Sequence, residues 1–146
     1  MKKILFILAA ALLCTVSVAA KDIVSRNVND LPVAAQSVVK NNFKSKVTLI
    51  KIDKGMVGVS EYEVILADGS EISFDKNGNW KDVEMPVGKQ VPDYFVPKTI
   101  KDYVAKNNKG QKIIGIEKDR SSYEVKLNNG IEMKFDRAGN FLRYDD

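Results

Sequence analysis

Apolar residues recur along this chain with two spacings, and each spacing predicts a different element. In two places an apolar residue stands just before a proline, and further apolar residues follow it at positions i+4, i+7 and i+8. This spacing places the apolar side chains on one face of a helix, and proline suits the first helical turn. The sequence therefore predicts helices near residues 32–43 and 97–108.

Alternation of apolar and polar residues follows each helix and is typical of strands with one buried face. In the first half of the chain it covers residues 47–52, 62–66 and 72–74. Asp68-Gly69 and Asn129-Gly130 lie between such segments, and glycine supplies the positive φ angle that a tight hairpin requires. Three or four antiparallel strands with short connections are expected after each helix.

The two halves of the chain resemble each other in sequence. Residues 62–80 align with residues 123–141, and 10 of these 19 positions are identical, whereas unrelated segments would share about one. The helix-opening prolines of the two halves lie 65 positions apart, whereas the matching strands lie 61 positions apart. The first half therefore carries extra residues between its helix and these strands, and we place them in a longer loop at Gly55–Gly58. The pattern predicts an α+β protein with two tandem copies of a helix followed by a three- to four-stranded antiparallel meander.

The N-terminal 20 residues have the three regions of a secretory signal peptide. Lys2 and Lys3 precede the apolar run 4–13, and small residues lead to Ala20. Cleavage after Ala20 is expected, and a retained membrane anchor is the alternative. Cys14 raises the further alternative of a lipidated N-terminus, for which its neighbours are a poor match. The sequence thus predicts a periplasmic or secreted protein whose mature form has no cysteine.

These residues together resemble a known family. Leu31-Pro32 and Val96-Pro97 open the helices, and Tyr-Glu-Val, a hairpin glycine, Phe-Asp and Gly-Asn-aromatic then occur twice after a signal peptide. The pattern is similar to the PepSY-like proteins of Bacteroidetes, which are described as resembling beta-lactamase-inhibitor proteins in fold. The resemblance implies helices packed on one sheet face. It divides the chain into a signal peptide (1–20), a first PepSY-like repeat (21–85), a linker (86–94) and a second repeat (95–146).

Composition and charge exclude several classes of function. Without the signal peptide the chain has 21 basic and 19 acidic residues, which gives no support for nucleic-acid binding. The chain has no histidine, and this removes the commonest general base, the usual nucleophile arrangements and the commonest metal ligand. We therefore expect no enzyme activity and no cofactor, although catalysis by carboxylates or lysine is not forbidden.

The segment Asp75–Asn79 resembles the start of a calcium loop, because oxygen-bearing side chains recur at alternate positions. Pro86 stands where such a loop needs its last glutamate, and Ala138 replaces Asn77 in the second half. A hairpin turn capped by Asp75 explains the pattern without metal, and we expect no metal site here.

The preferred functional hypothesis is a non-enzymatic periplasmic module that binds a protein or peptide through the exposed sheet face. The halves differ on that face, where Ile65 and its neighbours are more apolar than the matching residues near Lys126. A peptidase-inhibitor-like regulator, which the resemblance implies, is one alternative, and a carboxylate-dependent periplasmic hydrolase or a structural envelope component are others. The candidate binding residues are Glu63, Ile65, Glu124, Lys126, Glu132 and Lys134.

Overall fold

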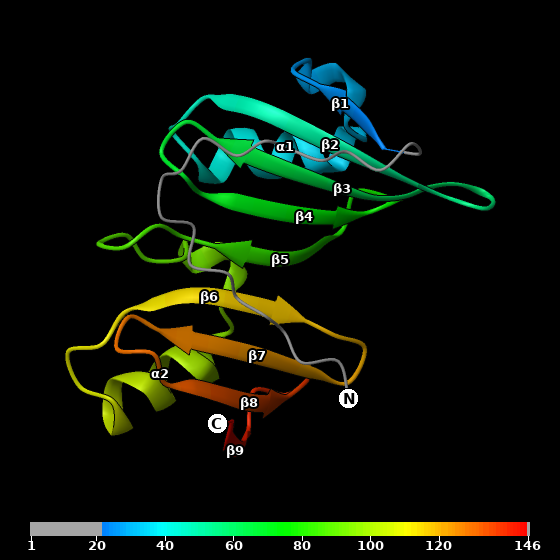
Figure 1. The fold of residues 1–146 in the computed structure, drawn as a ribbon. Coiled ribbons are helices and arrows are strands. Elements are labelled where there is room, and N and C mark those ends of the chain that lie inside the picture. The colour runs from blue at the N-terminus through cyan, green and yellow to red at the C-terminus, as the bar shows by residue number, and fades with distance from the viewer. Residues whose placement is uncertain (1–21, 146) are drawn as a thin grey trace.

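The computed structural model describes residues 22–145, which form one nine-stranded antiparallel sheet and two short α-helices (Figure 1). The strands lie in the sheet in chain order, with β1 at one edge and β9 at the other. The elements are β1 (Ile23–Ser25), the 3-10 helix η1 (Val28–Asp30), α1 (Val33–Asn42), β2 (Val47–Gly55), β3 (Gly58–Leu66), β4 (Glu71–Asp75), β5 (Trp80–Glu84), the 3-10 helix η2 (Asp93–Phe95), α2 (Lys98–Asn107), β6 (Ile113–Lys118), β7 (Ser122–Leu127), β8 (Glu132–Asp136) and β9 (Phe141–Asp145).

The predicted α+β fold of two tandem helix-plus-meander copies is wrong. β5 pairs with β6 through Asp82↔Glu117, Val83↔Ile116 and Glu84↔Gly115, so the strands of both halves form a single continuous sheet. Strands dominate the described residues, and each α-helix has only ten residues. Periodicity identified individual elements but not this pairing, because β5 and β6 are separated by the long connection 85–112 and no local pattern encodes their contact.

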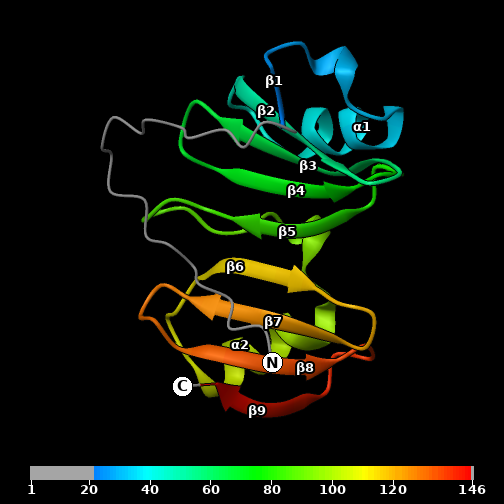
Figure 2. The same ribbon diagram turned by 45° about the vertical axis from the view of Figure 1, so that its right-hand side comes forward.

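The two α-helices begin directly after the prolines that predicted them. Pro32 and Pro97 are the N-cap residues of α1 and α2, with φ angles of −54° and −53°. Figure 1 shows both helices behind the strands, on the same face of the sheet, and in the turned view of Figure 2 α1 is seen to the side of β2 and β3. The opposite face therefore carries no helix within residues 22–145, and we call it the open face.

One apolar cluster fills the space between the helices and the sheet. Every second residue along the strands points into it, and the helices add residues spaced four apart. Phe74, Phe95 and Phe135 are its largest fully buried side chains. Val83 and Ile116, which face each other across β5 and β6, are also completely buried. The core thus continues across the junction between the halves.

The connection from β5 to α2 is tied to the neighbouring strand. The backbone N–H groups of Met85 and Val91 donate hydrogen bonds to the carbonyls of Ile114 and Ile113. Val91 and Phe95 are buried in the core. This part of the chain, which includes the expected linker 86–94, therefore contributes to packing.

The longer loop expected at Gly55–Gly58 is found as a longer hairpin. β2 and β3 have nine residues each, whereas β6 and β7 have six. The β2–β3 hairpin projects beyond the rest of the sheet (Figure 1), and Met56 and Val57 at its tip are fully exposed.

The expected signal peptide, residues 1–20, and its cleavage site lie outside the described residues. In the described part of the chain, neither helix has the length and apolar character that crossing a membrane requires.

Candidate functional site

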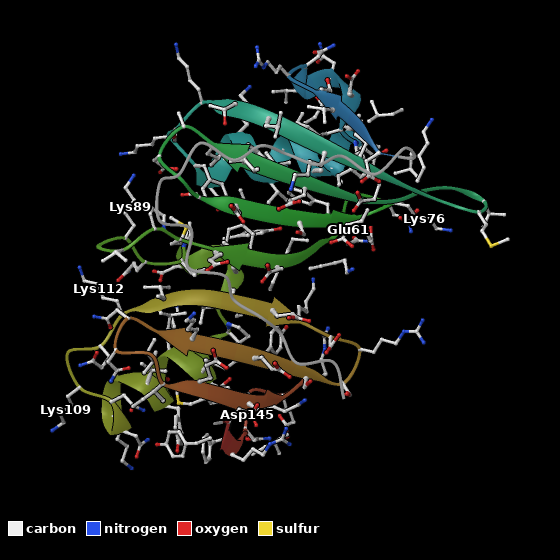
Figure 3. The ribbon with its side chains drawn as sticks, viewed as in Figure 1. Glu61, Lys76, Lys89, Lys109, Lys112 and Asp145 are labelled. Atoms are coloured by element: carbon white, nitrogen blue, oxygen red, sulfur yellow. The ribbon has the colours of Figure 1, made fainter. Side chains whose placement is uncertain are left out.

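The open face displays the polar residues that alternate with the core residues of each strand. The strand register arranges these side chains in two rows that cross the sheet. One row contains Lys51, Glu63, Ser73, Asp82, Glu117, Glu124 and Lys134, and the other contains Ile65, Glu71, Glu84, Gly115, Lys126 and Glu132. Figure 3 views this face directly, with Glu61 at the end where the β4–β5 turn carries Lys76.

Ion pairs occupy the two sides of the open face. Lys51 Nζ lies 2.9 Å from Glu63 Oε2, and Lys134 Nζ lies 2.9 Å from Glu124 Oε1. Each pair joins neighbouring strands, β2 with β3 and β7 with β8. These side chains are only partly exposed, so the pairs hold the sides of the face in a fixed arrangement more than they stabilise the fold.

The middle of the open face is acidic. Glu71, Asp82, Glu84 and Glu117 project from the adjacent strands β4, β5 and β6, where Glu71 lies opposite Glu84 and Asp82 opposite Glu117. Like charges directly opposite each other on a sheet are unfavourable. Burial raises the pKa of Glu71, Glu84 and Glu117 above the ordinary value of glutamate, and neighbouring carboxylates raise the pKa of Glu71 and Glu117 further.

Asp82 has the most perturbed environment of these four carboxyl groups. Burial, followed by the charges of Glu117 and Glu84, raises its pKa from 3.8 to about 7. Its Oδ1 atom is buried and accepts no hydrogen bond from any residue in the described part of the chain. A buried oxygen without a donor disfavours the ionised form. We name Glu71, Asp82, Glu84 and Glu117 the central carboxylates.

All six candidate binding residues from the sequence are located on the open face, but in two groups. Glu63 and Ile65 lie on β3, whereas Glu124 and Lys126 on β7 and the two residues of β8 lie beyond the central strands. Lys126 is opposite Glu132 in the register of β7 and β8. Burial raises the pKa of Glu84, and the positive charge of Lys126 opposes that rise. The two groups are separated by the central carboxylates.

None of the central carboxylates is among the six candidate binding residues predicted from the sequence. The alternation Asp82-Val83-Glu84 places two acids on either side of an apolar residue, and Glu117 follows the apolar Ile116. This pattern was enough to place each acid on a polar face. It did not show that the faces coincide, because that depends on the pairing of β5 with β6.

The Asp75–Asn79 turn is held together by its own hydrogen bonds. Asp75 Oδ1 accepts from the backbone N–H groups of Asn77 and Asn79 at 2.8 and 3.0 Å, and Oδ2 accepts from the Asn79 side-chain amide at 3.0 Å. Although burial opposes it, the hydrogen bonds from Asn79 and Asn77 lower the pKa of Asp75. Within residues 22–145, no group of three or more acidic, histidine or cysteine side chains has a geometry that could hold a metal ion.

Comparison with known proteins identifies relatives of the chain. A family model described as "Putative beta-lactamase-inhibitor-like, PepSY-like" matches residues 60–143. No curated protein matches the chain.

Three solved structures are similar over most of the chain. A putative periplasmic protein of unknown function from Bacteroides vulgatus ATCC 8482 is 41% identical, with a TM-score of 0.80, and the match covers 86% of this chain and 99% of that one. A second putative periplasmic protein from the same strain is 39% identical, with a TM-score of 0.79 and coverage of 88% and 99%. A putative calcium-regulated periplasmic protein from Bacteroides thetaiotaomicron is 37% identical, with a TM-score of 0.79 and coverage of 86% and 97%. None of these matches indicates an enzymatic family.

Proposed function

This chain belongs to the PepSY-like family, and from that premise we propose that it is a non-enzymatic periplasmic module that binds a protein or peptide through its open face. The periplasmic location follows the descriptions of its three relatives. The observation that carries the proposal is the group of central carboxylates, which lies on the sheet face that no helix of residues 22–145 covers, while both α-helices pack on the other face.

The energetics of the central carboxylates favour a partner that brings positive charge. Four neighbouring acids with raised pKa values repel one another and are partly removed from water. A lysine or arginine side chain placed among them would relieve that repulsion and form charge-assisted hydrogen bonds. The proposed partner therefore presents lysine or arginine on an extended or helical segment.

The surrounding ion pairs fit a binding surface of limited width. Lys51 with Glu63 on one side, and Lys134 with Glu124 on the other, are already neutral as pairs. The remaining negative charge is thus concentrated on β4, β5 and β6, where Lys51, Lys81 and Lys126 offset it only in part. This charge directs the positive group of a partner to the middle of the sheet.

A capture experiment with the immobilised protein tests this proposal. A periplasmic extract is applied to the wild-type protein, to the double variant Glu71→Gln with Glu84→Gln, and to a control double variant, Lys98→Met with Asp102→Asn, which removes an exposed ion pair on α2. We expect a partner that the wild type and the control retain and the open-face variant loses. Equal capture by all three proteins contradicts the choice of face.

The peptidase-inhibitor-like regulator is a special case of this proposal. It requires the captured partner to be a peptidase whose turnover slows in proportion to added protein. If a partner is captured and no peptidase activity changes, the result supports the binding function and excludes the inhibitory one.

A carboxylate-dependent hydrolase has less support from the geometry. Such an enzyme holds its acid and its base in a cavity that excludes water and positions the substrate between them. The central carboxylates instead lie along adjacent strands of an open sheet face. Hydrolysis of periplasmic peptides or glycans that disappears in the Glu71→Gln and Glu84→Gln variant would favour the enzyme over the binding module.

Calcium regulation, which is said of the Bacteroides thetaiotaomicron protein, is not part of this proposal. The segment of this chain with a calcium-like pattern is the Asp75–Asn79 turn, whose carboxylate already accepts hydrogen bonds from Asn77 and Asn79. A metal ion would compete with those bonds. Calorimetric titration of the protein with calcium, with Asp75→Asn as the matched variant, tests this view.

A further inference from the structure

A pocket of about 440 Å³ lies on the helix-covered side of the sheet, next to the only tryptophan. Its walls come from α1, the start of β5, η2 and the end of β6, and include Val38, Asn41, Trp80, Tyr94 and Lys118. The volume lies in the range of pockets that hold small ligands, about 300–1,000 Å³. We name it the Trp80 pocket. It is separate from the open face, because α1 forms one of its walls.

The other half of the chain shows what fills the corresponding space there. Phe141 is the first residue of β9, as Trp80 is of β5, and each follows a turn with a glycine at φ +85°. The ring of Tyr103 from α2 stacks on Phe141, with ring centres 4.6 Å apart and planes at 8°. A nearly parallel planar ring therefore occupies this space next to Phe141.

At the matching position of α1 the chain has Val38 instead of tyrosine. Val38 is the sixth residue of α1 and Tyr103 the sixth of α2. The turn glycines confirm this alignment, since Gly78 packs against Ala34 and Ala35, and Gly139 against the residues 65 positions later in α2. The indole ring of Trp80 meets Phe95 edge-on, with ring centres 5.2 Å apart, and valine is too small to stack on it. No parallel ring therefore takes the place that Tyr103 has beside Phe141, and the Trp80 pocket lies between Val38 and Trp80.

The wall of the pocket also carries a cation that forms no ion pair within residues 22–145. Lys118 Nζ lies 4.2 Å from the centre of the Trp80 ring, which is a cation–π contact. Burial, and then the charge of Arg137, lower the pKa of Lys118, and the charge of Asp75 opposes them only in part. An anionic group in the pocket would supply a direct counter-charge.

A free hydrogen-bonding group completes the lining. Among residues 22–145, the side-chain amide of Asn41 has no hydrogen-bond partner, and it lies on the exposed side of α1 at the pocket wall. It can donate to, or accept from, a polar substituent. The ring of Tyr94, which rests edge-on against Phe95 at 5.0 Å, forms a further aromatic wall.

We propose that the Trp80 pocket binds a small molecule whose planar ring stacks on Trp80 and whose anionic group pairs with Lys118. This site is additional to the binding function of the open face and does not depend on it. The chemical class that fits is a small aromatic carboxylate, because its ring takes the place that Tyr103 takes beside Phe141 and its charge satisfies Lys118.

Trp80 provides a direct readout, since tryptophan fluorescence of this chain arises from this residue alone. The probe is para-hydroxyphenylacetate, added to the wild-type protein while the fluorescence is recorded. Two matched probes separate the contributions: para-hydroxyphenylacetamide keeps the ring without the charge, and cyclohexylacetate keeps the charge without a planar ring. We expect saturable quenching by the first probe and binding about tenfold weaker for each of the others.

Two variants and a control locate the binding. Val38→Tyr should fill the space and abolish binding, with the circular dichroism spectrum unchanged, and Lys118→Met should weaken binding about tenfold by removing the charge. Lys40→Met, which changes an exposed lysine of α1 away from the pocket, should bind as the wild type does. No saturable quenching in the wild type, or undiminished binding in the Lys118→Met variant, overturns the proposal. Binding that persists in the Glu71→Gln and Glu84→Gln variant separates this site from the open face.

Discussion

Replacing Asp82 with asparagine should make the protein more stable than the native chain above neutral pH. The folded state raises the pKa of Asp82 from 3.8 to about 7, mainly by burial and then by Glu117 and Glu84. Between these two pH values the folded protein keeps a proton that the unfolded chain has lost. The free energy of unfolding therefore falls as the pH rises from about 4 to about 7. Above pH 7 it stays lower by the full amount that the ionisation of Asp82 causes.

The size of the effect follows from the two pKa values. Each unit of difference corresponds to about 1.4 kcal/mol, so the shift from 3.8 to about 7 amounts to about 4 kcal/mol once Asp82 is ionised. About 3 kcal/mol of this develops between pH 5 and pH 8. An asparagine side chain at this position has a similar shape and no charge, so the Asp82→Asn variant lacks this term at every pH.

Urea unfolding of both proteins at several pH values between 5 and 8 measures the difference. The stability advantage of Asp82→Asn should grow with pH by about 3 kcal/mol. Asp102→Asn, a change at an exposed carboxyl of α2, is the matched control and should show no such growth. An advantage that stays constant or shrinks as the pH rises would refute the assigned environment of Asp82.

Three further predictions concern the fold. In thermal unfolding, Gly78→Ala should lower the stability more than Gly88→Ala does. Both glycines have positive φ, but only the new Cβ at Gly78 would meet Pro32, at 2.9 Å. We expect a loss of about 1 kcal/mol at Gly88, from the backbone alone, and at least twice that at Gly78. Ile116→Ala should lower the free energy of unfolding by about 2–5 kcal/mol and leave a single transition, because this fully buried residue belongs to a core shared by both halves; two separate transitions by fluorescence and circular dichroism would contradict that. Lys134→Met should change stability by less than about 1 kcal/mol, as measured by urea unfolding, because its ion pair is partly exposed, and a larger loss would mean that the pair is essential to the sheet.

Local features of the fold could be predicted from the sequence. The helices after Pro32 and Pro97 and the hairpin glycines Gly69 and Gly130 lie where periodicity and turn chemistry place them. These features depend on neighbouring residues alone, so a single sequence contains the information. The polar character of the face that carries Glu63 and Lys134 also followed from alternation.

Features that depend on contacts between distant residues could not be predicted. The pairing of β5 with β6 joins strands on either side of α2 and turns the two expected units into one sheet. Burial is the main cause of the raised pKa of Asp82, and the charge of Glu117, the next largest cause, acts through that pairing. The exchange of Tyr103 for Val38 is visible in the sequence, but only the stacking of Tyr103 on Phe141 shows that it opens a pocket.

The strict chain order of the strands has a consequence for the rate of folding. Each strand pairs with the next one along the chain, and all but two of these pairs are joined by short turns. Such local pairings close quickly, because little chain entropy is lost in bringing their ends together. The β1–β2 and β5–β6 pairings each enclose a helix. The hairpins of the two halves should therefore form first, and the joining of β5 to β6 should limit how fast the native sheet forms.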